Sequence, residues 1–266
     1  MVKHTFNFVQ LALAILLLAV SRQATSEPYV IAYNHDWAPF SYVDSEGNVQ
    51  GILPRLMEEL SRESSIAELK AVGLPWDRVS HAVRHGEASA FITFASRERL
   101  GFSEAIGPTI YELGQNPVVR SEASVDQASI FQVEGLRYCQ MVGDDWSTAF
   151  YGALGIQSFA ARDSRACLNL IHRGRVDVFL HPVPIITIRM TQMNLKGALR
   201  QFDQPAATMP FHLLWRKDVP ERELQTARLL GRALSQLRQE KRWMPTIARI
   251  EQEAVTQCLG ANKAIC

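Results

Sequence analysis

The chain has 266 residues, of which 47% are hydrophobic and 21% are charged, the composition of an ordinary globular protein. Its 28 basic and 27 acidic residues leave a net charge of +1, which excludes a nucleic-acid binder that depends on a basic face. The composition also excludes a disordered chain, a collagen-like repeat and a coiled coil.

Residues 1–26 have the pattern of a secretory signal peptide. Lys3 precedes an apolar run over residues 11–20, which is about half the length of roughly 20 residues that a membrane-spanning helix needs. Small residues at Ala24 and Ser26 suit the −3 and −1 positions of a cleavage site. We therefore expect cleavage after Ser26 and a periplasmic location, with 26 basic and 27 acidic residues left in the mature chain.

Four cysteines stand in the part of the chain that is expected to reach an oxidising compartment, so we expect disulfides. They are Cys139, Cys167, Cys258 and Cys266. The sequence leaves all three pairings open, although a Cys258–Cys266 bond would close the C-terminal tail and leave Cys139 for Cys167. No cysteine pair has zinc-ligand spacing with a histidine, so we expect no metal and no cofactor.

Strand and helix patterns alternate in the first part of the mature chain. The predicted elements are a strand at 29–33, a helix at 53–61, a strand at 70–75, a helix at 77–85 and a strand at 89–94. The first helix rests on Leu53, Leu56, Met57 and Leu60, which share one helical face. This β-α-β-α-β order predicts a parallel sheet covered by helices.

A second α/β unit follows, and a final segment returns to the first. The predicted elements are a strand at 136–142, helices at 147–154 and 164–172, a strand at 176–180, a strand at 211–215 and a long helix at 221–241. Segments 116–119 and 203–210 lie between complete units, so we expect the chain to cross between two lobes there.

Polar and aromatic residues gather where the predicted strands end, which is where open α/β sheets bind ligands. The candidate binding residues are Asn34, Trp37, Trp76, Thr93, Phe94, Arg99, Trp146, Ser147, Thr148 and His181. Each alone has an ordinary explanation, such as core packing for a tryptophan or helix capping for Ser147. Their shared location predicts a cleft. The sequence lacks the local motifs of common enzyme classes, and we assign no catalytic residue.

Five segments together resemble the family 3 extracellular solute-binding proteins, the receptors of polar amino-acid ABC transporters. These segments are Asp36-Trp-Ala-Pro-Phe-Ser-Tyr42, Gly47-Asn-Val-Gln-Gly51, Pro75-Trp-Asp-Arg-Val79, Ser96-Arg-Glu-Arg99 and Gly174-Arg-Val-Asp177. The resemblance covers about residues 29–250. It implies an α/β, two-lobe, type II periplasmic-binding-protein fold with a two-stranded hinge.

That fold implies a discontinuous first lobe, residues 27–118 and 206–257, and a second lobe, residues 119–205, followed by a tail at 258–266. The implied partners are a small-molecule solute and an ABC permease in the inner membrane, and the implied state is a monomer.

The resemblance also assigns roles to individual residues. Trp37 and Trp76 would stack on the solute, and Arg99 would form a bidentate pair with its carboxylate. Ser147 and Thr148 would hold the same carboxylate through a hydroxyl group and backbone amides.

Several positions depart from the family pattern. Pro182 stands where an acidic residue normally pairs with the ammonium group of an amino acid, and the uncharged Asn34 replaces a second acid. Phe94 replaces a Ser or Thr, and Trp146 replaces a Gly. The expected pocket is more aromatic and less acidic than an amino-acid site, so we expect a carboxylate-bearing or aromatic solute in place of a standard zwitterionic amino acid.

Two other functions stay open at this point. An enzyme of the prephenate or arogenate dehydratase type needs an acid in the cleft, for which Asp36, Asp144, Asp145 and His181 are candidates. A ligand-sensing partner of a membrane signalling protein would use the same fold.

Overall fold

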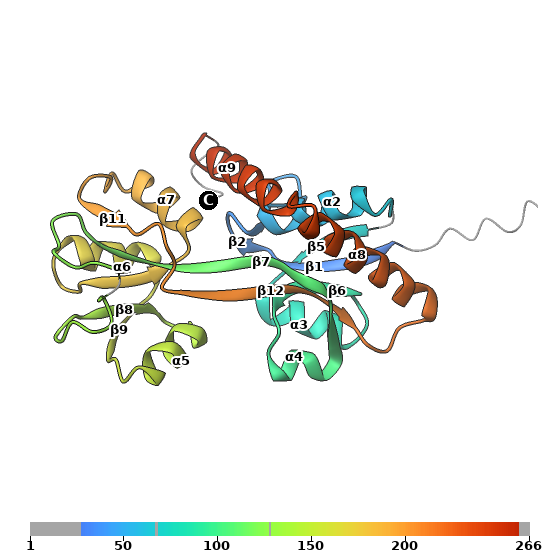
Figure 1. Cartoon of the computed structure of the whole chain (residues 1–266), viewed down its shortest axis with the longest axis horizontal. Helices are drawn as coiled ribbons and strands as arrows, with labels where there is room; N and C mark the ends of the chain where they lie inside the picture. Colours follow the sequence, from blue (N-terminus) through green and yellow to red (C-terminus); the bar gives the residue numbers. More distant parts are fainter. Residues whose placement is uncertain (1–27, 67–68, 128, 261–266) are drawn as a thin grey trace, which may run out of the picture.

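The computed structural model describes residues 28–66, 69–127 and 129–260. The expected signal peptide, its cleavage site after Ser26, and Cys266 lie outside these residues. The chain folds into two lobes that are joined by long strands, as Figure 1 shows.

The first part of the chain forms a parallel sheet with helices, as the sequence predicts. Its elements are β1 (Tyr29–Asn34), β2 (Asp36–Trp37), β3 (Ser41–Val43), β4 (Val49–Gln50), α2 (Ile52–Glu63), β5 (Leu69–Leu74), α3 (Trp76–Arg84), β6 (Ala90–Phe94) and α4 (Arg97–Phe102). Strand β1 pairs in parallel with β5 and with β6. The predicted apolar face of α2, including Leu53, Leu56, Met57 and Leu60, is buried.

Two long antiparallel strands, β7 (Ser103–Arg120) and β12 (Ala207–Arg216), connect the two lobes. Their pairing extends from Ser103 opposite Arg216 to Gln115 opposite Ala207. Beyond that point β7 pairs with strands of the second lobe, so nine of the described strands form one continuous sheet, while β2, β3 and β4 form a separate three-stranded sheet. The two crossing segments are tied by Asn116, whose amide group donates to the carbonyl oxygens of Phe202 and Asp203 at 2.9 and 3.1 Å.

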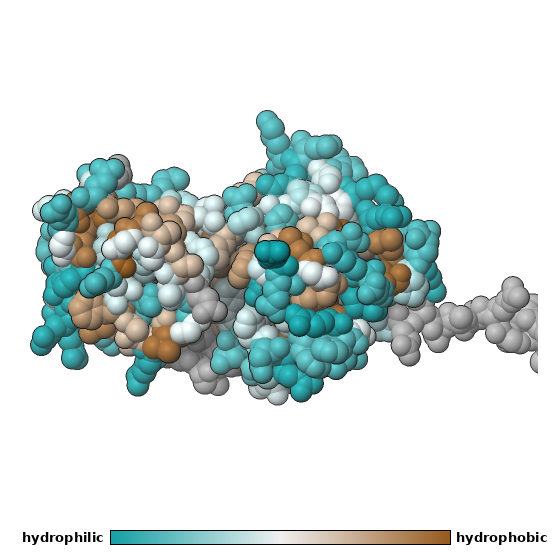
Figure 2. Space-filling model, turned by 90° about the horizontal axis from the view of Figure 1, so that it is seen from below, coloured by the Kyte–Doolittle hydropathy of each residue, from teal (hydrophilic) through white to brown (hydrophobic). Residues whose placement is uncertain are grey.

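The second lobe has its own sheet order and its own core. Its elements are β8 (Tyr138–Met141), α5 (Asp145–Ala153), β9 (Ser158–Ala161), α6 (Ser164–His172), β10 (Val178–His181), α7 (Val183–Gln192) and β11 (Leu199–Gln201). Strand β8 lies between β10 and β9 and is parallel to both. Leu168, Ile171 and Phe179 belong to a core cluster separate from that of the first lobe. In the space-filling view the lobes form two masses, each with apolar residues among polar ones (Figure 2).

The last two described elements are α8 (Glu221–Gln239) and α9 (Trp243–Gly260), which belong to the first lobe. The sequence predicts the first of these helices with nearly the same bounds. Trp243 is fully buried, and its indole nitrogen donates to the carbonyl oxygen of Ile110 at 2.7 Å. Helix α9 reaches across the hinge to α7, whose Ile185 joins the core cluster of the first lobe (Figure 1).

Gly51 makes the close turn from β4 into α2 possible. Its φ angle is 122°, and a Cβ atom there would lie 2.6 Å from the carbonyl oxygen of Phe40. That same oxygen accepts a hydrogen bond from the backbone nitrogen of Leu53 at 2.9 Å, so the chain cannot simply move away. We expect Gly51→Ala to lower the free energy of unfolding by about 2–3 kcal/mol in urea titrations.

Gly47→Ala is the matched control, because Gly47 also has a positive φ, 86°, yet nothing lies within 4 Å of its Cβ position. Its expected cost is about 1 kcal/mol, from backbone strain alone. Equal losses in the two variants would contradict the close-approach argument.

Candidate functional site

A cavity of about 270 Å³ opens between the lobes, beyond the carboxyl ends of β1 and β6. Its floor is formed by Leu113, Met209 and Phe211 of the two long strands, and Gly143, Asp144 and Trp146 approach it from the second lobe. The cavity brings together seven of the ten residues that the sequence singles out: Asn34, Trp37, Trp76, Thr93, Phe94, Arg99 and Trp146.

The other three candidates do not line this cavity. Ser147 is buried at the start of α5, with 1% of its surface exposed. Thr148 is exposed, and its hydroxyl donates to the backbone oxygen of Asp144 at 3.0 Å. His181 is buried at the end of β10, where its ring stacks on Phe179 with a centroid separation of 4.8 Å.

Arg99 is held in place by backbone and aromatic contacts. Its Nη1 donates to the carbonyl oxygen of Phe94 at 3.1 Å, and its Cζ lies 4.1 Å from the ring centroid of Phe94 and 5.2 Å from that of Trp76. Burial lowers the pKa of Arg99, although a guanidinium stays charged at neutral pH. The neighbouring carboxylate of Glu98 is paired with Arg84, so no carboxylate among the described residues is paired with Arg99.

The tryptophans of the cavity differ in how firmly they are packed. Trp37 lies against the first-lobe core, with ring centroids 4.5 Å from Phe40 and 5.9 Å from Phe211. Trp76, by contrast, has 42% of its surface exposed. An exposed indole beside a cavity is a surface on which a solute can stack. On the second lobe, Trp146 stacks on Phe150 at 4.9 Å.

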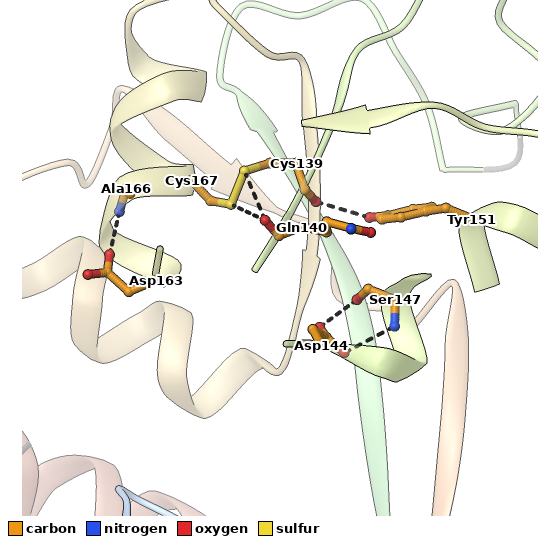
Figure 3. Close-up of a disulfide and its surroundings, with 8 residues drawn as sticks. All are labelled: Cys139, Gln140, Asp144, Ser147, Tyr151, Asp163, Ala166 and Cys167. Carbon is orange, nitrogen blue, oxygen red and sulfur yellow. Dashed lines mark hydrogen bonds between the residues drawn. A yellow bond between two sulfur atoms is a disulfide. The ribbon is translucent and has the colours of Figure 1, made fainter. Parts of the chain in front are cut away.

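The side-chain carboxylate of Asp144 caps the start of α5. Asp144 accepts a hydrogen bond from the backbone nitrogen of Ser147 at 3.0 Å and another from the Ser147 hydroxyl at 2.6 Å (Figure 3). In this arrangement Ser147 does not present its hydroxyl and amide to a solute carboxylate, the role that the sequence suggests. From the sequence, Asp144 stands among the residues at strand ends and among possible enzyme acids but is not identified as a helix cap, although an aspartate before a helix is a frequent N-cap.

A disulfide between Cys139 and Cys167 joins β8 to α6, with 5.8 Å between the Cα atoms (Figure 3). This pair is one of the pairings that the sequence leaves open. Cys258 is also disulfide-bonded, whereas Cys266 lies outside the described residues. Strand β8 leads directly into Gly143 and Asp144, so the disulfide anchors the second-lobe side of the cavity.

The Gly174–Asp177 motif has a structural role in the second lobe. The carboxylate of Asp177 accepts hydrogen bonds from the backbone nitrogen, Nε and Nη2 of Arg137 at 2.9–3.0 Å. These bonds lower the pKa of Asp177 below its usual range. The motif thereby joins the start of β8 to the start of β10.

His181 is expected to make the stability of the fold depend on pH. Burial first, and then the nearby Arg189 cation, lower the pKa of His181 to about 3. Between pH 6.5 and 3 the unfolded chain therefore binds a proton at this residue that the folded chain does not bind, and stability falls as the pH falls. The slope approaches about 1.4 kcal/mol per pH unit below pH 6.5, so this residue is expected to remove between about 1 and 2 kcal/mol between pH 6.5 and pH 5.

Urea titrations at both pH values measure this effect, with His181→Gln expected to lose less stability on acidification than the unmodified protein. His172→Gln is the control, since His172 is exposed on the same lobe. An unchanged pH dependence in His181→Gln would show that other groups cause it.

Two lobes around a hinge of two antiparallel strands, with a cavity between them, define the type II periplasmic-binding-protein fold. The chain matches the model of the bacterial extracellular solute-binding proteins, family 3, over residues 29–249, and it belongs to that family. No curated protein sequence matches it. Within the described ranges no helix is long and apolar enough to cross a membrane, and no cluster of three or more His, Cys, Asp or Glu could hold a metal ion.

Solved structures share the fold at low sequence identity. The second substrate-binding domain of Lactococcus lactis GlnP, in an open conformation, is 15% identical with a TM-score of 0.62, over 86% of this chain and 97% of that chain. An ancestral amino-acid-binding protein described as a precursor of cyclohexadienyl dehydratase is 16% identical, with a TM-score of 0.59 over 84% and 94%. A histidine kinase sensor domain is 13% identical, with a TM-score of 0.59 over 84% and 95%.

Proposed function

We propose that this protein is a periplasmic receptor that captures a small carboxylate-bearing or aromatic solute between its lobes and delivers it to an ABC permease. The observation that carries the proposal is Arg99, a half-buried cation that lines the same cavity as Trp37 and Trp76. Family membership supports solute capture in general, and these side chains suggest the class of solute.

Arg99 is suited to bind a carboxylate because most of its N–H donors have no hydrogen-bond partner among the described residues. A guanidinium has five N–H donors in a planar fork, and the only hydrogen bond from the Arg99 side chain among the described residues goes to Phe94. A carboxylate can accept two parallel hydrogen bonds from such a fork, and these bonds gain strength where water is partly excluded. The two flanking rings hold the guanidinium in position before a solute arrives.

We expect the lobes to close over the solute, which accounts for the partial exposure of Trp76 at the cavity. We take residues 27–118 and 206–257 as one moving lobe and residues 119–205 as the other, with β7 and β12 as the hinge. A solute that contacts both lobes binds the closed state better than the open state, so it shifts the equilibrium toward closure. Closure would also bury the exposed face of Trp76, which adds apolar stabilisation.

A dehydratase-like enzyme is the second candidate, because one possible acid, Asp144, lines the cavity. Two other candidate acids are less well placed: Asp36 is exposed and His181 is buried, and neither lines the cavity. The solved precursor of cyclohexadienyl dehydratase shares the fold, which by itself does not select an activity.

A thermal-shift screen tests the proposal, since a solute that binds only the folded protein raises its melting temperature. The panel contains amino acids, dicarboxylates, aromatic acids and polyamines, with calorimetry on every compound that shifts the melting temperature. We expect saturable binding of a carboxylate or aromatic compound, without turnover of prephenate or arogenate. Turnover would favour the enzyme, and a response to polyamines alone would overturn the proposed solute class.

A further inference from the structure

We propose that His81, in the last turn of α3, and His85, its C-cap, together bind one divalent transition-metal ion of the class of Cu²⁺, Ni²⁺ and Zn²⁺. Helix α3 belongs to the first lobe (Figure 1), and two residues four positions apart on a helix lie on the same face. The two ring centroids are 3.9 Å apart, with 25° between the ring planes. Neither histidine lines the cavity between the lobes, so this site is separate from the proposed solute site.

The surroundings of the two rings leave their Nε2 atoms as the metal ligands. Nδ1 of His85 lies 2.9 Å from the carbonyl oxygen of His81. Because a carbonyl oxygen can only accept, this Nδ1 carries the proton, and the lone pair of the neutral ring is on Nε2. Nδ1 of His81 faces a carboxylate oxygen of Glu87 at 3.8 Å, which favours the same tautomer. Metal-bound histidines are oriented in this way, with the second ring nitrogen directed at a carbonyl or carboxylate oxygen.

The end of α3 also favours a positive charge. The carbonyl groups of the last turn of a helix carry a partial negative charge, and Glu87 adds a full one beside His81. Arg78, 3.9 Å from the other oxygen of Glu87, is the opposing cation, while Arg84 is paired with Glu98. Two protonated rings would repel each other at a separation of 3.9 Å, whereas one metal ion is a single charge that both rings share.

Imidazole nitrogen ligands select the class of ion. They suit Zn²⁺, Cu²⁺ and Ni²⁺, whereas Mg²⁺ and Ca²⁺ prefer oxygen ligands. Two histidines four positions apart on a helix form a known ligand pair for zinc. Here His81 and His85 supply two ligands, and water completes the coordination. Both residues are exposed, so an ion reaches them without a change of fold, and Cu²⁺ is expected to bind more tightly than Ni²⁺ or Zn²⁺.

Calorimetry on the purified protein without a polyhistidine tag tests this site. The probes are Cu²⁺, Ni²⁺ and Zn²⁺, with Mg²⁺ as the control ion. The variants are His81→Ala, His85→Ala and the double variant, and alanine at these exposed positions preserves the helix. His172→Ala is the matched control, because His172 is an exposed histidine in the last turn of α6 and no second histidine stands four positions from it.

We expect the Kd for Cu²⁺ to rise at least about tenfold in His81→Ala and in His85→Ala, since each substitution removes one of two ligands. Because both rings hold the same ion, the double variant is expected to bind no more than about twofold more weakly than either single variant. His172→Ala is expected to stay within about twofold of the unmodified protein. Cu²⁺ should also raise the melting temperature of the unmodified protein more than that of His81→Ala.

Four results would overturn the proposal. An unchanged Kd in His81→Ala or in His85→Ala would show that the ion binds elsewhere, and so would an equal rise in His172→Ala. Additive losses in the double variant would show two separate weak sites in place of one shared ion. Binding of Mg²⁺ as tight as that of Zn²⁺ would point to carboxylate ligands. The proposed solute function stands or falls independently of these results, because none of the three histidines lines the cavity.

Discussion

Arg99→Ala is expected to weaken the binding of a carboxylate solute at least about 100-fold. That factor corresponds to about 2.7 kcal/mol, within the range for removing one partner of a charge-assisted hydrogen-bonded pair. The substitution also removes the guanidinium that lies over Phe94 and Trp76, so the aromatic side of the cavity loses its support. Calorimetry with the tightest carboxylate from the screen measures the change.

Two further variants test whether the loss of binding comes from the guanidinium group of Arg99. Arg99→Lys keeps the positive charge but lacks the planar fork, so we expect a loss of about tenfold. Arg62→Ala removes an arginine of the same lobe outside the cavity, since Arg62 pairs with Glu59 within α2. Its expected effect on Kd is less than about twofold. If Arg99→Ala and Arg62→Ala changed the Kd equally, Arg99 would not be the carboxylate partner.

The α/β architecture could be predicted because its signals are local and periodic. A short stretch of sequence is enough to predict α2 from its apolar spacing and to predict β1 and β6 from their runs of strand-forming residues. Strand β7 could not be recognised in this way, since Gly107, Pro108, Gly114 and Pro117 interrupt its alternation. It is held as a strand by pairing with β12, whose residues lie about 100 positions further along the chain, which is a tertiary effect.

Helix α7 was missed for a related reason. Pro182 and Pro184 are typical of a loop, yet a proline in the first turn of a helix costs nothing because its missing N–H would have no helical partner. Strand β9, four residues long, carries too few residues for a periodic signal.

The sequence predicts where the candidate site lies, but it does not predict how charge is arranged in the cavity. Seven candidates line the cavity because they follow strand ends, a rule that holds for open α/β sheets in general. The segment from Asp144 to Thr148 contains several residues that can cap a helix, and sequence alone does not decide which one does. The structure selects Asp144, which places a carboxylate where the sequence suggested an anion-binding turn.

Removing the disulfide between Cys139 and Cys167 is expected to be the most destabilising change to the second lobe. The two cysteines are 28 residues apart, and closing a loop of that length lowers the entropy of the unfolded chain by an amount worth about 3–4 kcal/mol. A Cys139→Ala and Cys167→Ala double variant should therefore unfold at much lower urea concentration. Reducing agent should bring the unmodified protein and the double variant to a similar midpoint, and the shift that it causes in the double variant reports the disulfide of Cys258.

The position of the disulfide also predicts how the double variant unfolds. Cys139 and Cys167 belong to a core cluster separate from that of the first lobe, so their loss should destabilise one lobe more than the other. Of the five tryptophans in the chain, Trp146 alone falls within residues 119–205. A fluorescence change of Trp146 that precedes the loss of helical circular dichroism would show the second lobe unfolding first, whereas one coincident transition would show that the hinge strands and α9 couple the lobes too tightly for separate unfolding.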